Sequence, residues 1–157
     1  RFGFEGRRLP LVSVSSPGIP LRLDLVYNNR DEGASSLSGR WSTNFDVGLS
    51  VREEGAYTVV IVRWPDGTRS RYATLAGTDF TGEFSDGSRV KQNYTTKTES
   101  WDLLYHDGLG YHFTASGLLD SIHDGKGNSI TFARENSTFP SVPTRVTDND
   151  GHEILLS

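Results

Sequence analysis

Five Asp-Gly pairs divide the 157-residue chain into short segments. Asp caps a turn with its own side chain, and Gly takes a positive φ without steric cost. Between apolar or alternating runs, such a pair predicts a β-hairpin, so the chain is expected to fold as consecutive antiparallel hairpins. The pairs are Asp66-Gly67, Asp86-Gly87, Asp107-Gly108, Asp124-Gly125 and Asp150-Gly151.

Before the first of these pairs, apolar and polar residues alternate at residues 21–27 and 45–51, and an apolar run follows at 57–64. Alternation with period two is typical of a half-buried strand, so all four apolar residues of 45–51, Val51 included, are expected to point inward. Residues 30–40 are small and polar and are interpreted as a long loop. No window carries an adequate helical stripe. We therefore predict an all-β fold in which serial antiparallel β-hairpins form a curved sheet.

Two pairs of segments are internal copies. Residues 63–72 match 104–113 at an offset of 41, and residues 122–132 match 146–156 at an offset of 24. A period in the twenties indicates a repeat array, in which each unit buries its apolar face against its neighbours.

The stretch "HDGKGNSITF", residues 123–132, has the glycines and lysine of a phosphate-binding loop. In such a loop the lysine is followed by Ser or Thr and then by a helix. Here Lys126 precedes Gly127 and Asn128, and the second copy has Asp150 at the lysine's position. A carboxylate would repel a phosphate, so this stretch is predicted to be the corner of a hairpin.

Composition excludes several classes of function. The net charge is −4, so no basic field attracts nucleic acid. There is no cysteine, which excludes disulfides and thiolate metal sites. No apolar run approaches the ~20 residues of a membrane helix, so no membrane insertion is expected. The sequence begins with Arg1 rather than Met, and we expect it to be part of a longer polypeptide.

The order of these motifs resembles the RHS / YD-repeat proteins, from about Pro10 to the end. "SSPGIPLRLDLVYNNRDEGASSLSGRWSTNFDVGLSV" resembles the module that opens that family's repeat region. "LYHDGLGYHFTASGLLDSIHDGKGNSITFARE" resembles a following hairpin and a first repeat unit. Two positions depart from the family pattern: Arg134-Glu135 stands where Tyr-Asp closes the unit, and Leu118 stands where Arg usually follows Gly.

The resemblance implies a strip of hairpins at the start of a hollow β-shell, in a secreted or cell-surface protein of bacterial origin, often toxin-associated. Its partners would be neighbouring β-repeats of the parent chain, an enclosed polypeptide, or another copy at an open sheet edge. The family's cleavage motif and C-terminal effector are absent from this stretch, so no such activity is expected of it. The predicted parts are a lead-in at 1–20, a β opening module at 21–75, a loop-rich connection with short strands at 76–99, and hairpin and repeat units at 100–157.

The residues expected to matter are therefore structural, and no catalytic, cofactor-binding or metal-binding residue is predicted. The predicted packing anchors are Tyr27, Trp41, Phe45, Trp64 and Trp101. The predicted turn glycines are Gly67, Gly108, Gly125 and Gly151.

Two functional alternatives stay open. Aromatic faces on a sheet can stack on sugar rings, so a carbohydrate-binding or adhesion module would use Trp64, Trp101 and Tyr105. A glycan-active enzyme would need two facing carboxylates, and no acid pair stands out among the 20 acidic residues.

The histidines and one acidic loop offer less specific signals. His106 and His112 flank a turn, and a metal site there would need Asp102 or Asp107 as well. A hydrolase triad at Ser121 and His123 is rejected, because no nucleophile elbow occurs and strand neighbours point to opposite faces. The "DNDGHE" stretch, with Asp148, Asp150 and Glu153, is half a calcium loop, and turn chemistry explains its composition equally well.

Overall fold

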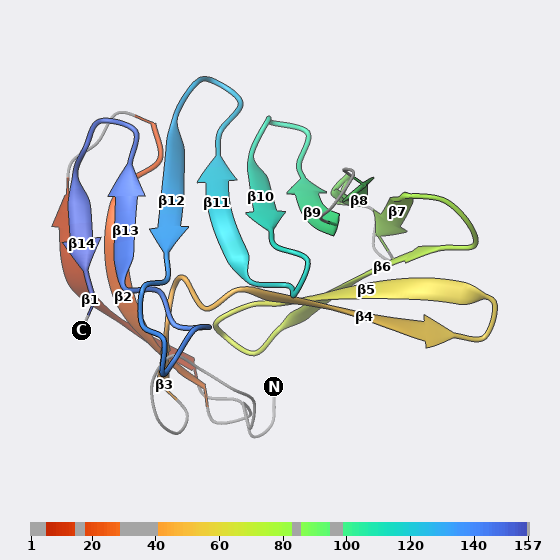
Figure 1. Cartoon of the computed structure of the whole chain (residues 1–157), viewed down its shortest axis with the longest axis horizontal. Helices are drawn as coiled ribbons and strands as arrows, with labels where there is room; N and C mark the ends of the chain where they lie inside the picture. The colour runs from red at the N-terminus through yellow and green to blue at the C-terminus, as the bar shows by residue number, and fades with distance from the viewer. Residues whose placement is uncertain (1–5, 15–17, 29–40, 83–85, 95–98, 157) are drawn as a thin grey trace.

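The computed structural model describes residues 6–14, 18–28, 41–82, 86–94 and 99–156, and this part of the chain is all β, with no helix (Figure 1). The described residues therefore include no helix that could cross a membrane. The strands are β1 (Gly6–Val14), β2 (Leu21–Asn28), β3 (Trp41–Thr43), β4 (Gly48–Glu54), β5 (Tyr57–Arg63), β6 (Arg69–Thr74), β7 (Asp79–Gly82), β8 (Arg89–Tyr94), β9 (Glu99–Leu104), β10 (Gly110–Phe113), β11 (Leu119–His123), β12 (Ser129–Ala133), β13 (Arg145–Asp148) and β14 (Glu153–Leu155).

These strands form two sheets. The N-terminal sheet has the order β1-β2-β3, and the main sheet has eleven strands, β4 to β14, in strict sequence order. Every neighbouring pair of the main sheet is antiparallel. The all-β class and the serial hairpins are therefore confirmed.

One loop geometry recurs in the main sheet. It is a five-residue loop whose first residue donates its backbone N–H to the carbonyl of the fifth, at 2.9–3.2 Å. The fourth residue is a glycine with φ between 84° and 92°. A turn closed by a left-handed residue matches the right-handed twist of the strands, and glycine takes that conformation at least cost. The loops are Trp64–Thr68, Tyr105–Leu109, Thr114–Leu118, Asp124–Asn128 and Asp148–His152.

Aspartate stabilises four of these loops through its side chain. Asp66 and Asp107, in the middle of their loops, each accept the backbone N–H two residues later at 3.0 Å. Asp124 and Asp148, at the first loop position, each accept two backbone N–H groups. The copies at offsets of 41 and 24 thus share loop chemistry as well as sequence.

The predicted turn glycines all lie in loops and all have positive φ. The loop at Asp124–Asn128 nevertheless has Gly127, not Gly125, at the recurrent fourth position. The loop at Thr114–Leu118 has no Asp-Gly pair and was not predicted. In the β4–β5 hairpin, Glu54 pairs with Tyr57, so only Gly55 and Ala56 remain between the strands.

The first strand of the main sheet turns back onto a later loop. The N–H of Leu49 donates to the carbonyl of Gly117 at 3.0 Å, and Gly48 and Leu118 form a β-bridge. Figure 1 shows the consequence: the β4–β5 hairpin runs across the foot of β10 and β11 rather than alongside them. The contact encloses the apolar face of the sheet at this corner.

The core lies on this apolar face and is completed by the N-terminal sheet, which lies beside β13 and β14 (Figure 1). Leu21 and Leu23 of β2 belong to the same buried cluster as Val146 and Ile154. Phe45 is 6% exposed and packs edge-on against a phenylalanine of β12, with ring centroids 5.1 Å apart.

One sequence-based expectation at the N-terminal end is wrong, and the structure adds detail to two of the predicted segments. Val51 is 44% exposed rather than inward, because the outer end of the β4–β5 hairpin extends beyond the core. The lead-in contains a nine-residue strand, β1. The opening module of 21–75 contributes to both sheets. The predicted loop at 30–40 lies outside the described residues, as does the side chain of Trp41.

Candidate functional site

Trp64 leads a row of aromatic side chains on the apolar face of the main sheet. Its indole N–H donates to the Ser70 hydroxyl at 2.9 Å, and its ring meets Tyr111 edge-on, with centroids 5.4 Å apart at 81°. Tyr111 in turn contacts Tyr105 at 6.3 Å. Burial raises the pKa of both tyrosines above the usual value of 10.0. The row is a packing unit with one edge open to solvent.

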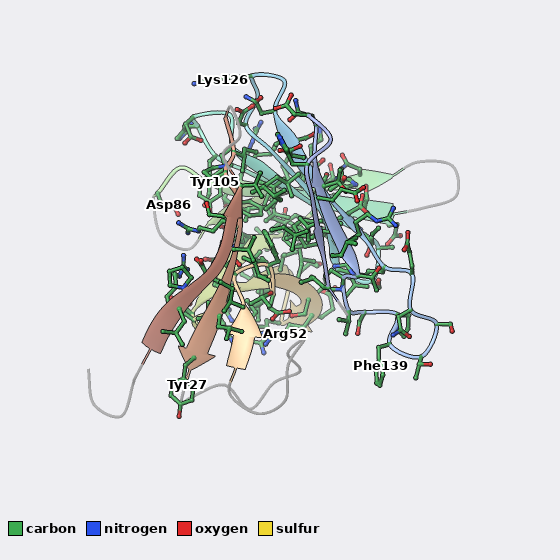
Figure 2. All side chains as sticks on the ribbon, turned by 90° about the vertical axis from the view of Figure 1, so that its left-hand side faces the viewer. Tyr27, Arg52, Asp86, Tyr105, Lys126 and Phe139 are labelled. Carbon is green, nitrogen blue, oxygen red and sulfur yellow. The ribbon has the colours of Figure 1, made fainter. Side chains whose placement is uncertain are left out.

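The other predicted aromatic anchors differ in burial. Trp101 is 4% exposed and packs edge-on against Phe80, with centroids 5.7 Å apart. A buried ring has no face to offer a sugar, so Trp101 is removed from the glycan alternative, which keeps the half-buried Trp64 and Tyr105. Tyr27 is half-buried and lies at the far end of β2, away from the main cluster of side chains (Figure 2).

Exposed aromatic rings occur elsewhere. Among the described residues, the exposed large aromatic side chains are Tyr57, at 48%, and Phe139, at 60%. Phe139 projects from the β12–β13 connection, well apart from the aromatic row (Figure 2). The two do not form a patch with the predicted sugar-binding residues.

A groove lies where the N-terminal sheet meets the main sheet, and we refer to it as the inter-sheet groove. Its volume is about 330 Å³, at the lower end of the range of small-molecule sites. Trp64 and Tyr111 of the aromatic row line it, together with the polar residues described below. Its remaining lining is apolar: Ile19, Pro20, Phe45, Val47, Pro65, Ile122 and Ile130.

The polar end of the inter-sheet groove contains two guanidinium groups. Arg8 and Arg22 are 53% and 47% exposed, and both approach the carboxylate of Asp24, at 3.4 and 3.1 Å. The Asp24 side chain is 1% exposed, and neither of its oxygens accepts a hydrogen bond within the described part of the chain. A buried carboxylate needs compensating charge, so the two arginines are held near it.

Two other polar side chains that line the groove, Asn44 and Trp64, already have hydrogen-bonding partners. Asn44 accepts the backbone N–H of Asp24 at 2.8 Å and donates its own amide to the carbonyl of Arg22 at 3.0 Å. The indole N–H of Trp64 is bonded to Ser70. The two guanidinium groups are the charged groups of the lining that a ligand in the groove would meet.

The histidine metal site considered in the sequence does not assemble in the described residues. His112 bonds to Asp102 at 2.6 Å, and Asn93 donates to the other oxygen of that carboxylate, also at 2.6 Å. The ring of His106 instead lies over Gly87, in the preceding hairpin. In the described residues, the one group of three metal-ligating side chains is Asp148, Asp150 and His152.

That group has a structural explanation. His152 bonds to Asp148 through Nδ1 at 2.8 Å, and in the copied loop the amide of Asn128 makes the equivalent bond to Asp124 at 2.7 Å. The Asp148 carboxylate also accepts two backbone N–H groups. Glu153, the other acidic residue of the stretch that resembles half a calcium loop, is not part of the group.

No protein-family model matches this chain, and no curated protein matches its sequence.

The inter-sheet groove could not be found from the sequence. Arg8, Arg22 and Asn44 come from separate segments, and no local pattern marks them as neighbours of Trp64 and Tyr111. Only the packing of one sheet on the other brings them together.

Proposed function

We propose that this chain is a non-enzymatic structural segment of an RHS/YD-type repeat protein, and that it forms part of a wall or scaffold. The observation that carries the proposal is the main sheet itself. Its eleven strands follow one another without a crossover, and five of its connections share one loop geometry. Such a strip can be extended by further hairpins without changing those already formed, which is the property a repeat wall requires.

The arrangement of ionisable groups supports a structural role. The two histidine–carboxylate clusters, at Asp148 and at Asp102, are bonded within a loop or across neighbouring strands. Neither carboxylate lines the inter-sheet groove. A reaction centre needs convergent groups in a pocket, so these clusters favour structure over catalysis.

The partners we propose lie at the sheet edges. Strand β14 is the last strand of the main sheet, and its Leu155 is 69% exposed. In the register with β13, the backbone N–H and carbonyl groups of Ile154 and Leu156 point towards β13. Those of Leu155, between them, therefore point away from β13, to the open edge of the sheet. A further repeat of a longer chain, or a second copy, would pair there. On the same proposal the protein is bacterial and secreted or displayed at the cell surface.

Replacing Trp64 by Ala tests the structural role against the glycan-binding alternative. The proposal predicts that the wild-type protein gives no signal on a glycan array. It also predicts that Trp64→Ala lowers the free energy of unfolding by about 3 kcal/mol, because the variant loses the contact with Tyr111 and the bond to Ser70. Urea denaturation followed by circular dichroism measures this loss.

Tyr57→Ala is the matched control, because it removes an exposed aromatic ring at the outer end of the β4–β5 hairpin. We expect it to change stability by less than about 0.5 kcal/mol. Glycan binding by the wild type that disappears in a folded Trp64→Ala variant would replace the structural proposal with the binding module. Hydrolysis of any glycan on a panel would favour the enzyme instead.

A further inference from the structure

We infer that the inter-sheet groove binds a small amphipathic anion, with an apolar or aromatic body and a single anionic head group. Neither the predicted fold nor the proposed structural role requires such a site. The inference depends on the lining of the groove, its charge, and the hydrogen bonds already made by its walls.

The body of the ligand follows from the floor and walls. The floor is the apolar face of the main sheet, where Tyr111, Ile122 and Ile130 lie side by side on β10, β11 and β12. The walls add Trp64 from the β5–β6 loop and Ile19 from the segment before β2. Burial of an apolar body against this surface is favourable roughly in proportion to the area removed from water.

The head group follows from charge. Arg8 and Arg22 bring two positive charges to the groove, and Asp24 compensates one of them. Asp24 is buried beneath the two arginines, whereas about half of each arginine side chain is exposed. One net positive charge thus remains at the mouth, where an anionic head would meet guanidinium N–H groups directed away from Asp24.

The same lining disfavours a neutral sugar. A sugar exposes a hydroxyl on nearly every carbon, and each needs a partner when it is buried. Asn44 and the Trp64 indole already use their hydrogen-bonding groups within the protein, and most of the remaining lining is apolar. A ligand with one polar end therefore matches the groove better than a carbohydrate.

Two fluorescent probes that differ in one charge test the inference. 1-Anilinonaphthalene-8-sulfonate carries an apolar body and a sulfonate, and N-phenyl-1-naphthylamine has the same body without it. We expect the sulfonate to bind the folded protein with one-to-one stoichiometry, at least about tenfold more tightly than the amine. Fluorescence titration gives the affinities, and calorimetry gives the stoichiometry.

Substitution of one arginine locates the site. Arg22→Gln should weaken binding of the sulfonate about tenfold and leave binding of the amine unchanged, while Arg22→Lys, which keeps the charge, should lose less. Arg69→Gln is the matched control, because Arg69 is exposed on β6 and does not line the groove. If Arg22→Gln does not fold, Arg8→Gln provides the same comparison at the other guanidinium.

Three outcomes would overturn the inference. Equal affinity of the two probes would mean that the groove recognises no charge. Absence of binding by either probe would mean that the groove is closed to ligands in the folded protein. An equal loss in Arg22→Gln and Arg69→Gln would mean that the effect is long-range. None of these outcomes bears on the structural proposal, which Trp64→Ala and the glycan array test separately.

Discussion

The loops at Thr114–Leu118 and Asp148–His152 have the same backbone hydrogen bonds and very different surroundings. Both close a hairpin through a glycine with positive φ, at 85° in Gly117 and 89° in Gly151. The first loop accepts a hydrogen bond from Leu49, 68 residues earlier in the chain, whereas Gly151 has open space around it. Local sequence determines the turn, and the tertiary contact determines how much a given turn contributes to the fold.

Gly117→Ala should cause the largest loss of stability. A Cβ at this position would overlap the carbonyl oxygen of Leu49, and the new side chain would also have to adopt a positive φ. The strained conformation costs about 1–2 kcal/mol, and displacing β4 from the loop should raise the total to about 4 kcal/mol. Urea unfolding measures the loss.

Gly151→Ala and Gly127→Ala are the matched controls, because each has the same conformation and no atom within 4 Å of the added Cβ. We expect each to cost only the 1–2 kcal/mol, roughly, of the strained backbone. If all three variants lose the same free energy, the contact between β4 and the loop contributes nothing to stability.

Gly108→Ala tests an intermediate case, in which two loops touch each other. A Cβ at Gly108 would lie 2.9 Å from the carbonyl oxygen of Asp124, and one at Gly125 would lie 3.1 Å from the carbonyl oxygen of Gly108. Both contacts are with the backbone of the other loop tip, and both are less severe than the overlap at Gly117. We therefore expect about 2–3 kcal/mol for either variant, between the open loops and Gly117.

A double-mutant cycle sharpens this prediction. Gly108→Ala and Gly125→Ala disturb the same contact, so their combined loss should fall short of the sum by at least about 0.5 kcal/mol. Additive losses would show that the loops are energetically independent, even though their backbones are in contact.

The sequence allowed the all-β class and the hairpin corners at the Asp-Gly pairs to be predicted, because turn chemistry is local. It did not reveal the loop containing Gly117, where Ser116 stands at the position usually held by Asp. Nor did it reveal the division into two sheets or the return of β4, since these depend on contacts between distant residues. The inter-sheet groove has no sequence signal for the same reason: nothing local marks Arg8 and Arg22 as residues that line one groove with Trp64.

The smallest expected effect concerns pH and the Asp124 carboxylate. Its pKa is lowered mainly by the hydrogen bond from the Asn128 side chain, with a further contribution from the backbone N–H of Lys126. A carboxyl group with a depressed pKa in the folded state stabilises the protein above its usual pKa of about 3.9, and that stability is lost as pH falls through the folded value. Asp124→Asn should therefore flatten the fall in melting temperature below about pH 4.

Asp150→Asn is the control for this comparison, because Asp150 is an exposed aspartate of the copied loop. In that loop the carboxylate of Asp148, not that of Asp150, accepts the two backbone N–H groups. We expect it to keep the wild-type dependence of melting temperature on pH. Asn at 124 still offers an oxygen to the backbone N–H groups, so the Asp124→Asn variant should differ little from wild type at pH 7. A large loss of melting temperature at pH 7 would mean that the charge of Asp124, rather than its hydrogen-bonding geometry, stabilises the loop. The backbone pattern common to the five loops would then explain less of their stability than we infer.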